Sequence, residues 1–148
     1  LAGWIVLCFG AAALGAGYGP GPWYSSLNKP SFNPPNWIFG PVWTTLYIFM
    51  AIAAWRVTCR VQFPSAWRPI GLFLFQLALN AAWTPIFFGL HWLGIAFFEL
   101  VCLWFAILAT ILTFRKIDRI AMALLVPYLA WVSFAGFLNL TLWRMNPQ

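Results

Sequence analysis

Residues 92–114 read WLGIAFFELVCLWFAILATILTF, an almost unbroken apolar run whose only charged side chain is Glu99. A helix that crosses the hydrocarbon core of a bilayer needs about 20 apolar residues, each adding ~1.5 Å toward a thickness of ~30 Å. This run reaches that length and contains no helix-breaking proline. It therefore predicts a transmembrane helix, and the fold depends on how often such runs recur.

Four further apolar stretches flank this run, at 1–19, 38–55, 66–89 and 120–143, and the second extends as a helix to about residue 58. All of them should be helices, because an isolated span in lipid must satisfy its own backbone hydrogen bonds. Together they occupy nearly the whole chain and leave no room for a soluble domain. The sequence thus predicts an all-α, multi-pass integral membrane protein, a five-transmembrane-helix bundle that forms one domain over residues 1–148.

The basic residues fall into two unequal groups along these predicted spans. Loops two and four lie on the same side of a five-helix bundle and are flanked by Arg56, Arg60, Arg68, Arg115, Lys116 and Arg119. Only Lys29 and Arg144 lie on the other side, so the positive-inside rule places the N-terminus in the cytoplasm and the first loop outside. Because topology explains the net charge of +6, the bilayer is an expected partner and nucleic acid is not.

The first loop, residues 20–37, is unusual in composition. Six of the eleven prolines lie between Pro20 and Pro41, interleaved with aromatic side chains. A flexible linker would be rich in glycine and serine and poor in apolar residues. We expect this stiff, apolar segment to fold back over the bundle as a lid; the alternative is a loop that rests in the lipid headgroups.

Polar side chains follow one face of the predicted helix at 66–89. Gln76 and Asn80 are four residues apart, and Trp83 follows three residues later, so the three share a face. Polar groups in a spanning helix face the bundle interior. The alternative role for these amides is to hold helices together, which interhelical Asn and Gln side chains commonly do.

Two other predicted helices carry comparable stripes. Trp43 and Tyr47 are four residues apart, and Trp131, Ala135 and Asn139 repeat at the same interval. If all three stripes face inward, they enclose a cavity lined by indoles, amides and a phenol. Such a cavity suits a large, flat, mostly apolar ligand and suits small ions and sugars poorly.

Residues for common catalytic chemistry are missing from the sequence. It holds no nucleophile elbow, phosphate loop or paired carboxylates, so no catalytic residues and no metal ligands are assigned. His91 is the only histidine, and one histidine does not define a metal site. Glu99 lies inside a span, where we expect it to be protonated or paired with an inward group such as Tyr47 or an asparagine.

Small residues repeat at four-residue intervals in the first predicted span, at Ala11, Gly15 and Gly19. This spacing lets two helix backbones approach closely, as in GxxxG dimers. It predicts a homodimer contact, with packing inside the monomer as the alternative.

Several runs of the sequence resemble one family. They are WYSSLNKPSFNPPNW at 23–37 followed by GPVWT at 40–44, QLALNAAW at 76–83 with PIFFG at 85–89, and PYLAW at 127–131 with the pairs FA, LN and WR at 134–135, 138–139 and 143–144. These runs are similar to the signature of the TspO/MBR family, the tryptophan-rich sensory, translocator or peripheral benzodiazepine receptor proteins. They span nearly the whole chain, which looks like a bacterial member, and the charge split then favours the bacterial inner membrane over the outer one.

The resemblance implies five helices, often paired as dimers, with a pocket under the first loop that binds porphyrins, sterols and benzodiazepine-type ligands. It implies no cofactor, since protoporphyrin IX or a haem-type porphyrin would be the ligand. Leu140 and Thr141 replace the tyrosine-containing sterol motif of animal members, so sterol affinity should be weak. The stripes and the resemblance together give as ligand-binding residues Trp23, Trp43, Tyr47, Gln76, Asn80, Trp83, Trp131, Ala135 and Leu138.

The expected function is that of a membrane receptor or transport protein for tetrapyrroles, acting in their movement, sensing or regulation. One alternative is a protein that degrades porphyrin with light and oxygen, which needs no catalytic motif because the bound porphyrin supplies the chemistry. Another is a ligand-regulated membrane scaffold.

Overall fold

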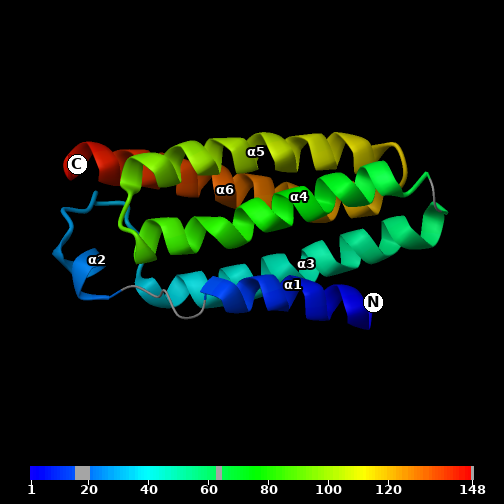
Figure 1. Cartoon of the computed structure of the whole chain (residues 1–148), viewed down its shortest axis with the longest axis horizontal. Coiled ribbons are helices and arrows are strands. Elements are labelled where there is room, and N and C mark those ends of the chain that lie inside the picture. Colours follow the sequence, from blue (N-terminus) through cyan, green and yellow to red (C-terminus); the bar gives the residue numbers. More distant parts are fainter. Residues whose placement is uncertain (16–20, 63–64, 148) are drawn as a thin grey trace.

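A computed structural model describes residues 1–15, 21–62 and 65–147, and shows long helices running side by side along one axis (Figure 1). The N-terminus and the C-terminus lie at opposite ends of this bundle. The elements in chain order are α1 (Ala2–Gly15), α2 (Pro22–Ser26), the 3-10 helix η1 (Asn36–Ile38), α3 (Phe39–Arg60), α4 (Trp67–Thr84), the π-helix η2 (Pro85–Gly89), α5 (Leu93–Arg115) and α6 (Arg119–Met145).

The helical membrane architecture expected from the sequence is confirmed. Among the residues described, four helices are long and apolar enough to cross a bilayer: Asn36–Arg60, Trp67–Gly89, Leu93–Arg115 and Arg119–Met145. The first predicted span is represented by a shorter apolar helix, α1, of 14 residues. Its expected end at Gly19 lies outside the described residues, as does Pro20 at the start of the expected lid.

Several helix ends differ by a few residues from those expected. Helix α3 continues to Arg60, past the predicted end at Trp55 or about residue 58, because long arginine side chains can extend from an apolar helix end to water. Pro127 lies inside α6 without ending it. At Pro85, by contrast, the α-helical pattern gives way to the π-helical turn η2, since proline has no N–H for the regular ladder.

Helix α5 packs between α4 and α6, α3 lies against α6, and α1 covers α3 and α4 (Figure 1). At Gly94 of α5, a β-carbon would lie 2.9 Å from the indole of Trp143 on α6. A side chain at this position would therefore require the indole or a helix to shift. Gly94 thus leaves room for Trp143 where α5 and α6 meet.

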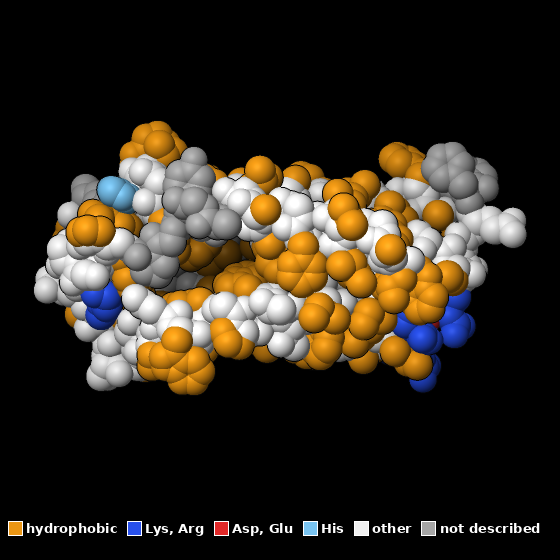
Figure 2. Space-filling view, turned by 90° about the horizontal axis from the view of Figure 1, so that it is seen from below, with side chains coloured by type: hydrophobic (Ala, Val, Ile, Leu, Met, Phe, Trp, Pro, Cys, Tyr) orange, Lys and Arg blue, Asp and Glu red, His pale blue; other side chains and the backbone are white. Residues whose placement is uncertain are grey.

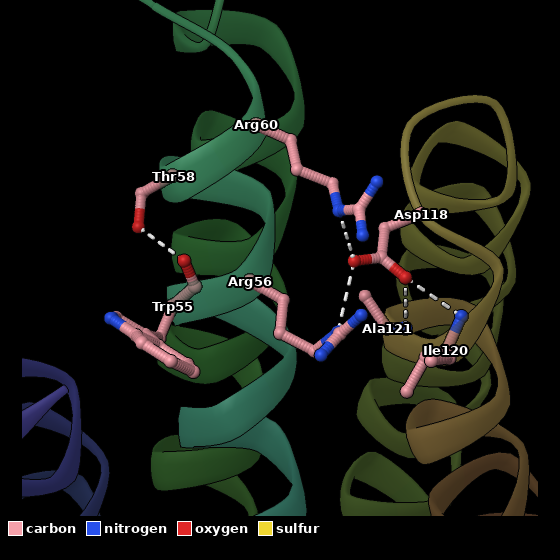
Figure 3. Close-up of polar contacts among 7 residues, drawn as sticks. All are labelled: Trp55, Arg56, Thr58, Arg60, Asp118, Ile120 and Ala121. Carbon is pink, nitrogen blue, oxygen red and sulfur yellow. Dashed lines mark hydrogen bonds and ion pairs between the residues drawn. The ribbon is translucent and has the colours of Figure 1, made fainter.

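The opposite end of the bundle is held by one carboxylate, Asp118, which precedes α6 (Figure 3). Its Oδ1 accepts hydrogen bonds from the backbone N–H groups of Ile120 at 2.8 Å and Ala121 at 3.2 Å. Its Oδ2 lies 2.9 Å from Nε of Arg56 and 2.7 Å from Nε of Arg60, both on α3. Asp118 therefore caps α6 and ties its start to the end of α3.

Burial by itself would raise the pKa of Asp118, but the hydrogen bonds from Ala121, Arg56 and Ile120 outweigh it, so the pKa lies below its usual value of 3.8. A carboxyl whose pKa is lowered by folding stabilises the fold above the unfolded pKa. That contribution is lost as the pH falls through the lower, folded pKa. Acid below about pH 3.8 should therefore loosen this end of the bundle first.

We expect Asp118→Asn to lower the free energy of unfolding by about 1–3 kcal/mol, because two partly exposed arginines, 25% and 55% exposed, lose their buried counter-charge. Asparagine still caps α6, whereas Asp118→Ala should cost about 1 kcal/mol more through the lost cap. Chemical unfolding in detergent micelles at neutral pH measures both values. Equal stability of the Asn variant and the wild type would show that the ion pairs contribute nothing.

Candidate ligand-binding cavity

A cavity of about 390 Å³ lies inside the bundle, beneath the segment that joins α1 to α3. Figure 2 shows the surface hollowed toward the same end, near α2. The walls of the cavity come mainly from α3, α4, η2 and α6. The lining residues are Ala12, Tyr24, Asn36, Phe39, Gly40, Trp43, Tyr47, Asn80, Trp83, Thr84, Phe87, Phe88, Leu100, Leu103, Trp131, Val132, Phe134, Ala135, Leu138, Asn139 and Leu142.

Aromatic rings form two groups in the lining of this cavity. In one, Trp43 and Trp131 meet edge to face, with centroids 6.5 Å apart and planes at 89°. In the other, Trp83 stacks on Phe87 at 4.8 Å. The N–H of Trp131 is buried and has no hydrogen-bond partner among the described residues. Ring contacts therefore hold Trp131, including one with Phe134 at 5.5 Å.

A chain of buried hydrogen bonds supports the cavity from below. The hydroxyl of Tyr47 donates to Oδ1 of Asn80 at 2.6 Å, and Nδ2 of Asn80 donates to the hydroxyl of Tyr128 at 2.7 Å. That hydroxyl donates in turn to Oε1 of Gln76 at 2.7 Å. The chain links α3, α4 and α6, so it fixes the spacing of the three helices that carry the stripes predicted from the sequence.

Asn139 positions the second aromatic wall. Its Oδ1 accepts the indole N–H of Trp83 at 3.2 Å, and its Nδ2 donates to the carbonyl of Leu93 at 2.9 Å. The indole of Trp83 is thus oriented by α6 rather than by its own helix. Of the two roles that the sequence left open for the amides, Asn139 combines both, because it joins helices and lines the cavity.

The segment from residue 21 to 37 contributes Tyr24 and Asn36 to the lining of the cavity. Tyr24 is buried against Phe87 and Phe88, and its hydroxyl donates to Oδ1 of Asn33 at 3.1 Å. Phe32 stacks on Phe137 of α6 at 5.3 Å. Tyr24 is thus buried on the protein, whereas Phe32 remains 41% exposed beside α6 and Trp37 is 72% exposed.

A pair of asparagines fastens this segment to the end of α6. The backbone N–H of Asn28 donates to Oδ1 of Asn146 at 2.9 Å, and Nδ2 of Asn146 donates back to the carbonyl of Asn28 at 2.9 Å. Asn146 also donates to the carbonyl of Leu142 at 2.9 Å. We call this arrangement the Asn28–Asn146 clasp. It joins the first loop to the last turn of the bundle.

Most of the ligand-binding residues expected from the sequence line this cavity. Those that do are Trp43, Tyr47, Asn80, Trp83, Trp131, Ala135 and Leu138. Trp23 instead stacks on His91, at 4.1 Å and an interplanar angle of 7°, outside the lining. Gln76 lies one helical turn below Asn80, where its Oε1 accepts the hydrogen bond from Tyr128 and its Nε2 has no partner among the described residues.

Sequence reasoning missed several lining residues. Phe87 follows Trp83 at four residues and Phe134 follows Trp131 at three, so helical spacing pointed to both. Leu103 follows Glu99 at four residues, which was a usable signal, whereas Leu100 lies in an apolar part of α5 and gave none. Tyr24, Asn36 and Phe39 reach the cavity through the fold of the first loop and the start of α3.

Glu99 does not form the expected pair with Tyr47 or an asparagine. Both of its carboxyl oxygens are buried without a hydrogen-bond partner in the part of the chain that the structure describes, since Tyr47 and Asn80 bond to each other. Within those same residues no three metal-ligand side chains come together. His91 has φ of 60° in the turn before α5.

The residues expected at a dimer contact are only partly described. Ala11 is half-buried and packs against the core of its own chain. Gly15 ends α1, and Gly19 lies outside the described residues.

Comparison with known proteins identifies the family to which the chain belongs. Residues 4–144 match the model of the TspO/MBR family. The protein CrtK of Rhodobacter capsulatus is 45% identical over 145 residues, which cover 97% of this chain and 91% of CrtK. The tryptophan-rich sensory protein of Cereibacter sphaeroides is 38% identical over 96% of this chain and 88% of its own length. The human translocator protein is 43% identical over 84% of this chain and 75% of its own length. The chain belongs to the TspO/MBR family of membrane proteins.

Proposed function

We propose that this protein binds tetrapyrroles, and other flat apolar molecules, in the cavity between α3, α4 and α6, and that it acts in their movement, sensing or regulation. One observation carries the proposal: a cavity of about 390 Å³ whose walls include Trp43, Trp83 and Trp131. Cavities of this size hold drug-sized ligands, and indole faces favour planar π-systems.

The polar groups of the cavity favour an apolar ligand. Tyr47 and Asn80 bond to each other, and Asn139 bonds to Trp83 and to the carbonyl of Leu93. These groups are therefore occupied in holding the walls. A ligand gains mainly from ring contacts here, which agrees with a porphyrin and disfavours a sugar or a small ion. Sterols are secondary ligands of weak affinity in this proposal.

The proposed arrangement in the membrane follows from the unequal distribution of basic residues between the two ends of the bundle. All five apolar helices cross the bilayer as one domain, with α1 as the shortest, and the N-terminus is cytoplasmic. The segment 21–37 acts as a lid over the cavity on the outer side, and the membrane is the inner membrane of a bacterium.

We expect Trp131→Leu to weaken protoporphyrin binding by about 1–3 kcal/mol, the loss typical of removing one aromatic partner from a flat heterocycle. Titration followed by porphyrin absorbance measures this without relying on protein fluorescence. Trp104→Leu is the matched control, because its indole lies outside the cavity and donates to Ser133 at 2.8 Å. Equal losses in the two variants would place the porphyrin elsewhere.

Binding, transport and degradation are separated by two measurements on the wild type. Porphyrin absorbance that falls only under illumination, with oxygen present and protein required, would establish light-dependent degradation. Release of porphyrin from sealed vesicles containing the protein, at a rate above that of empty vesicles, would establish transport. Stable absorbance together with no release leaves binding and sensing as the function.

We propose a homodimer contact on α1 through Ala11, Gly15 and Gly19. Gly15→Leu should convert the dimer to a monomer in mild detergent, because leucine separates backbones that small residues allow to touch. Light scattering of the purified variant measures the mass. A variant that remains dimeric would move the interface to another helix.

A further inference from the structure

The end of the bundle that carries Asp118 has a large surplus of positive charge. Six basic residues lie there, and Figure 2 shows most of the visible Lys and Arg side chains gathered at the end opposite α2. Asp118 is the only acidic residue at this end, because the other acid of the sequence, Glu99, lies within α5. The protein itself therefore leaves most of this charge uncompensated.

Asp118 has no capacity left for the other cations. Its side chain is only 3% exposed, and its two oxygens already accept from two backbone N–H groups and face two guanidinium groups. Arg56 and Arg60 both approach the same oxygen, Oδ2 (Figure 3). Two positive groups thus share one negative charge.

Each arginine contacts Asp118 through Nε alone. A guanidinium group carries five N–H donors, four of them on its two terminal nitrogens. In the described part of the chain, the terminal nitrogens of Arg56 and Arg60 make no hydrogen bond. The side chain of Arg60 is 55% exposed, so its guanidinium group is accessible from outside the protein. Forks of this kind match the paired oxygens of a phosphate.

The position of Arg56 and Arg60 relative to the bilayer indicates which kind of phosphate they would meet. Trp55 immediately precedes Arg56 on α3, and Trp67 begins α4 at the same end; both indoles are exposed, Trp67 by 67%. Exposed tryptophans at helix ends lie at the headgroup level of a bilayer. The arginines just beyond Trp55 are therefore at the level of the lipid phosphates.

We propose that Arg56 and Arg60, held by Asp118, bind the phosphate of a net-negative phospholipid headgroup and so complete the ionic cluster that joins α3 to α6. A zwitterionic lipid offers a phosphate as well, but its own cationic group cancels the charge. The surplus of positive charge at this end therefore favours lipids with a net negative charge, such as phosphatidylglycerol. This site lies at the opposite end of the bundle from the cavity and does not depend on what the cavity binds.

The test uses the full chain in detergent micelles, with phosphatidylglycerol or phosphatidylcholine added and the bound lipid measured by native mass spectrometry. We expect the wild type to retain phosphatidylglycerol, and Arg60→Gln to bind it about fivefold to tenfold more weakly. Arg68→Gln is the charge-matched control, because Arg68 lies at the same end and forms no ion pair among the described residues. It should keep most of the affinity. Arg60→Lys retains the charge without the fork and should be intermediate.

Three results would overturn the proposal. Equal losses in Arg60→Gln and Arg68→Gln would mean that lipid is attracted by diffuse charge alone. Equal retention of both lipids by the wild type would remove the selectivity. Inorganic phosphate that displaces phosphatidylglycerol at similar concentration would show a site for the free anion rather than a lipid. The thermal midpoint of each variant without added lipid identifies any that fails to fold, and Arg60→Lys then carries the comparison.

Discussion

Ala135→Phe should weaken protoporphyrin binding by about 100-fold or more, which corresponds to ~2.7 kcal/mol. Ala135 lies one turn beyond Trp131 and lines the cavity, so a phenyl ring there occupies the space between the indole walls. A closely packed site cannot absorb that volume without displacing the ligand or its neighbours. Absorbance titration of the purified variant measures the affinity.

The control for this prediction is the same substitution on the same helix, at a residue that faces away from the bundle. Ala123 is exposed on α6, and Ala123→Phe should bind porphyrin as the wild type does. Both variants should keep their helical content, since phenylalanine is well tolerated beside lipid. Wild-type affinity in Ala135→Phe would mean that the cavity is not the binding site.

Asn80→Leu should lower the free energy of unfolding by about 2–4 kcal/mol. The substitution keeps the approximate size of the side chain but removes both the acceptor for Tyr47 and the donor to Tyr128. Each interhelical hydrogen bond in a membrane contributes about 0.6–2 kcal/mol, and the hydroxyl of Tyr47 is left buried without a partner. Unfolding with a denaturing detergent in mixed micelles gives the value.

Two further variants test whether Asn80 acts as the centre of a chain. Tyr47→Phe removes one end of it and should cost less than Asn80→Leu, since Tyr128 still bonds to both amides. Ser133→Ala removes the acceptor for Trp104 on an exposed face of α6 and should change stability little. If Asn80→Leu costs no more than Ser133→Ala, the buried chain does not hold the three helices together.

The sequence predicted the cavity walls wherever a polar residue marked one face of a helix. Asn80 with Trp83, and Trp43 with Tyr47, identified their own inward faces, because a polar group in a spanning helix has only one favourable direction. Helix α5 carried one polar residue, Glu99, and Leu103 follows it at four residues, so the face of Leu103 could have been inferred from it. Leu100 lies among apolar residues on a different part of the helix, and nothing in the pattern distinguished it from its lipid-facing neighbours.

Side-chain length and loop geometry account for the other differences. Gln76 shares a face with Asn80, yet its amide oxygen accepts a hydrogen bond from the hydroxyl of Tyr128 and does not line the cavity. This contact depends on the distance between α4 and α6, which the spacing of residues within α4 does not give. The stack of Trp23 on His91 depends on a turn with positive φ that the sequence pattern does not encode. The π-helical turn that begins at Pro85, which the spacing of a regular α-helix does not describe, carries Phe87 into the wall.

The Asn28–Asn146 clasp couples two motions that would otherwise be independent. Moving the segment 21–37 away from the cavity breaks both bonds between the asparagines, and fraying of the last turn of α6 breaks them as well. Displacement of this segment and local unfolding of the C-terminal turn are thus coupled through the same two bonds. Amide hydrogen exchange at Asn28 reports how often its bond to Asn146 breaks, by either motion.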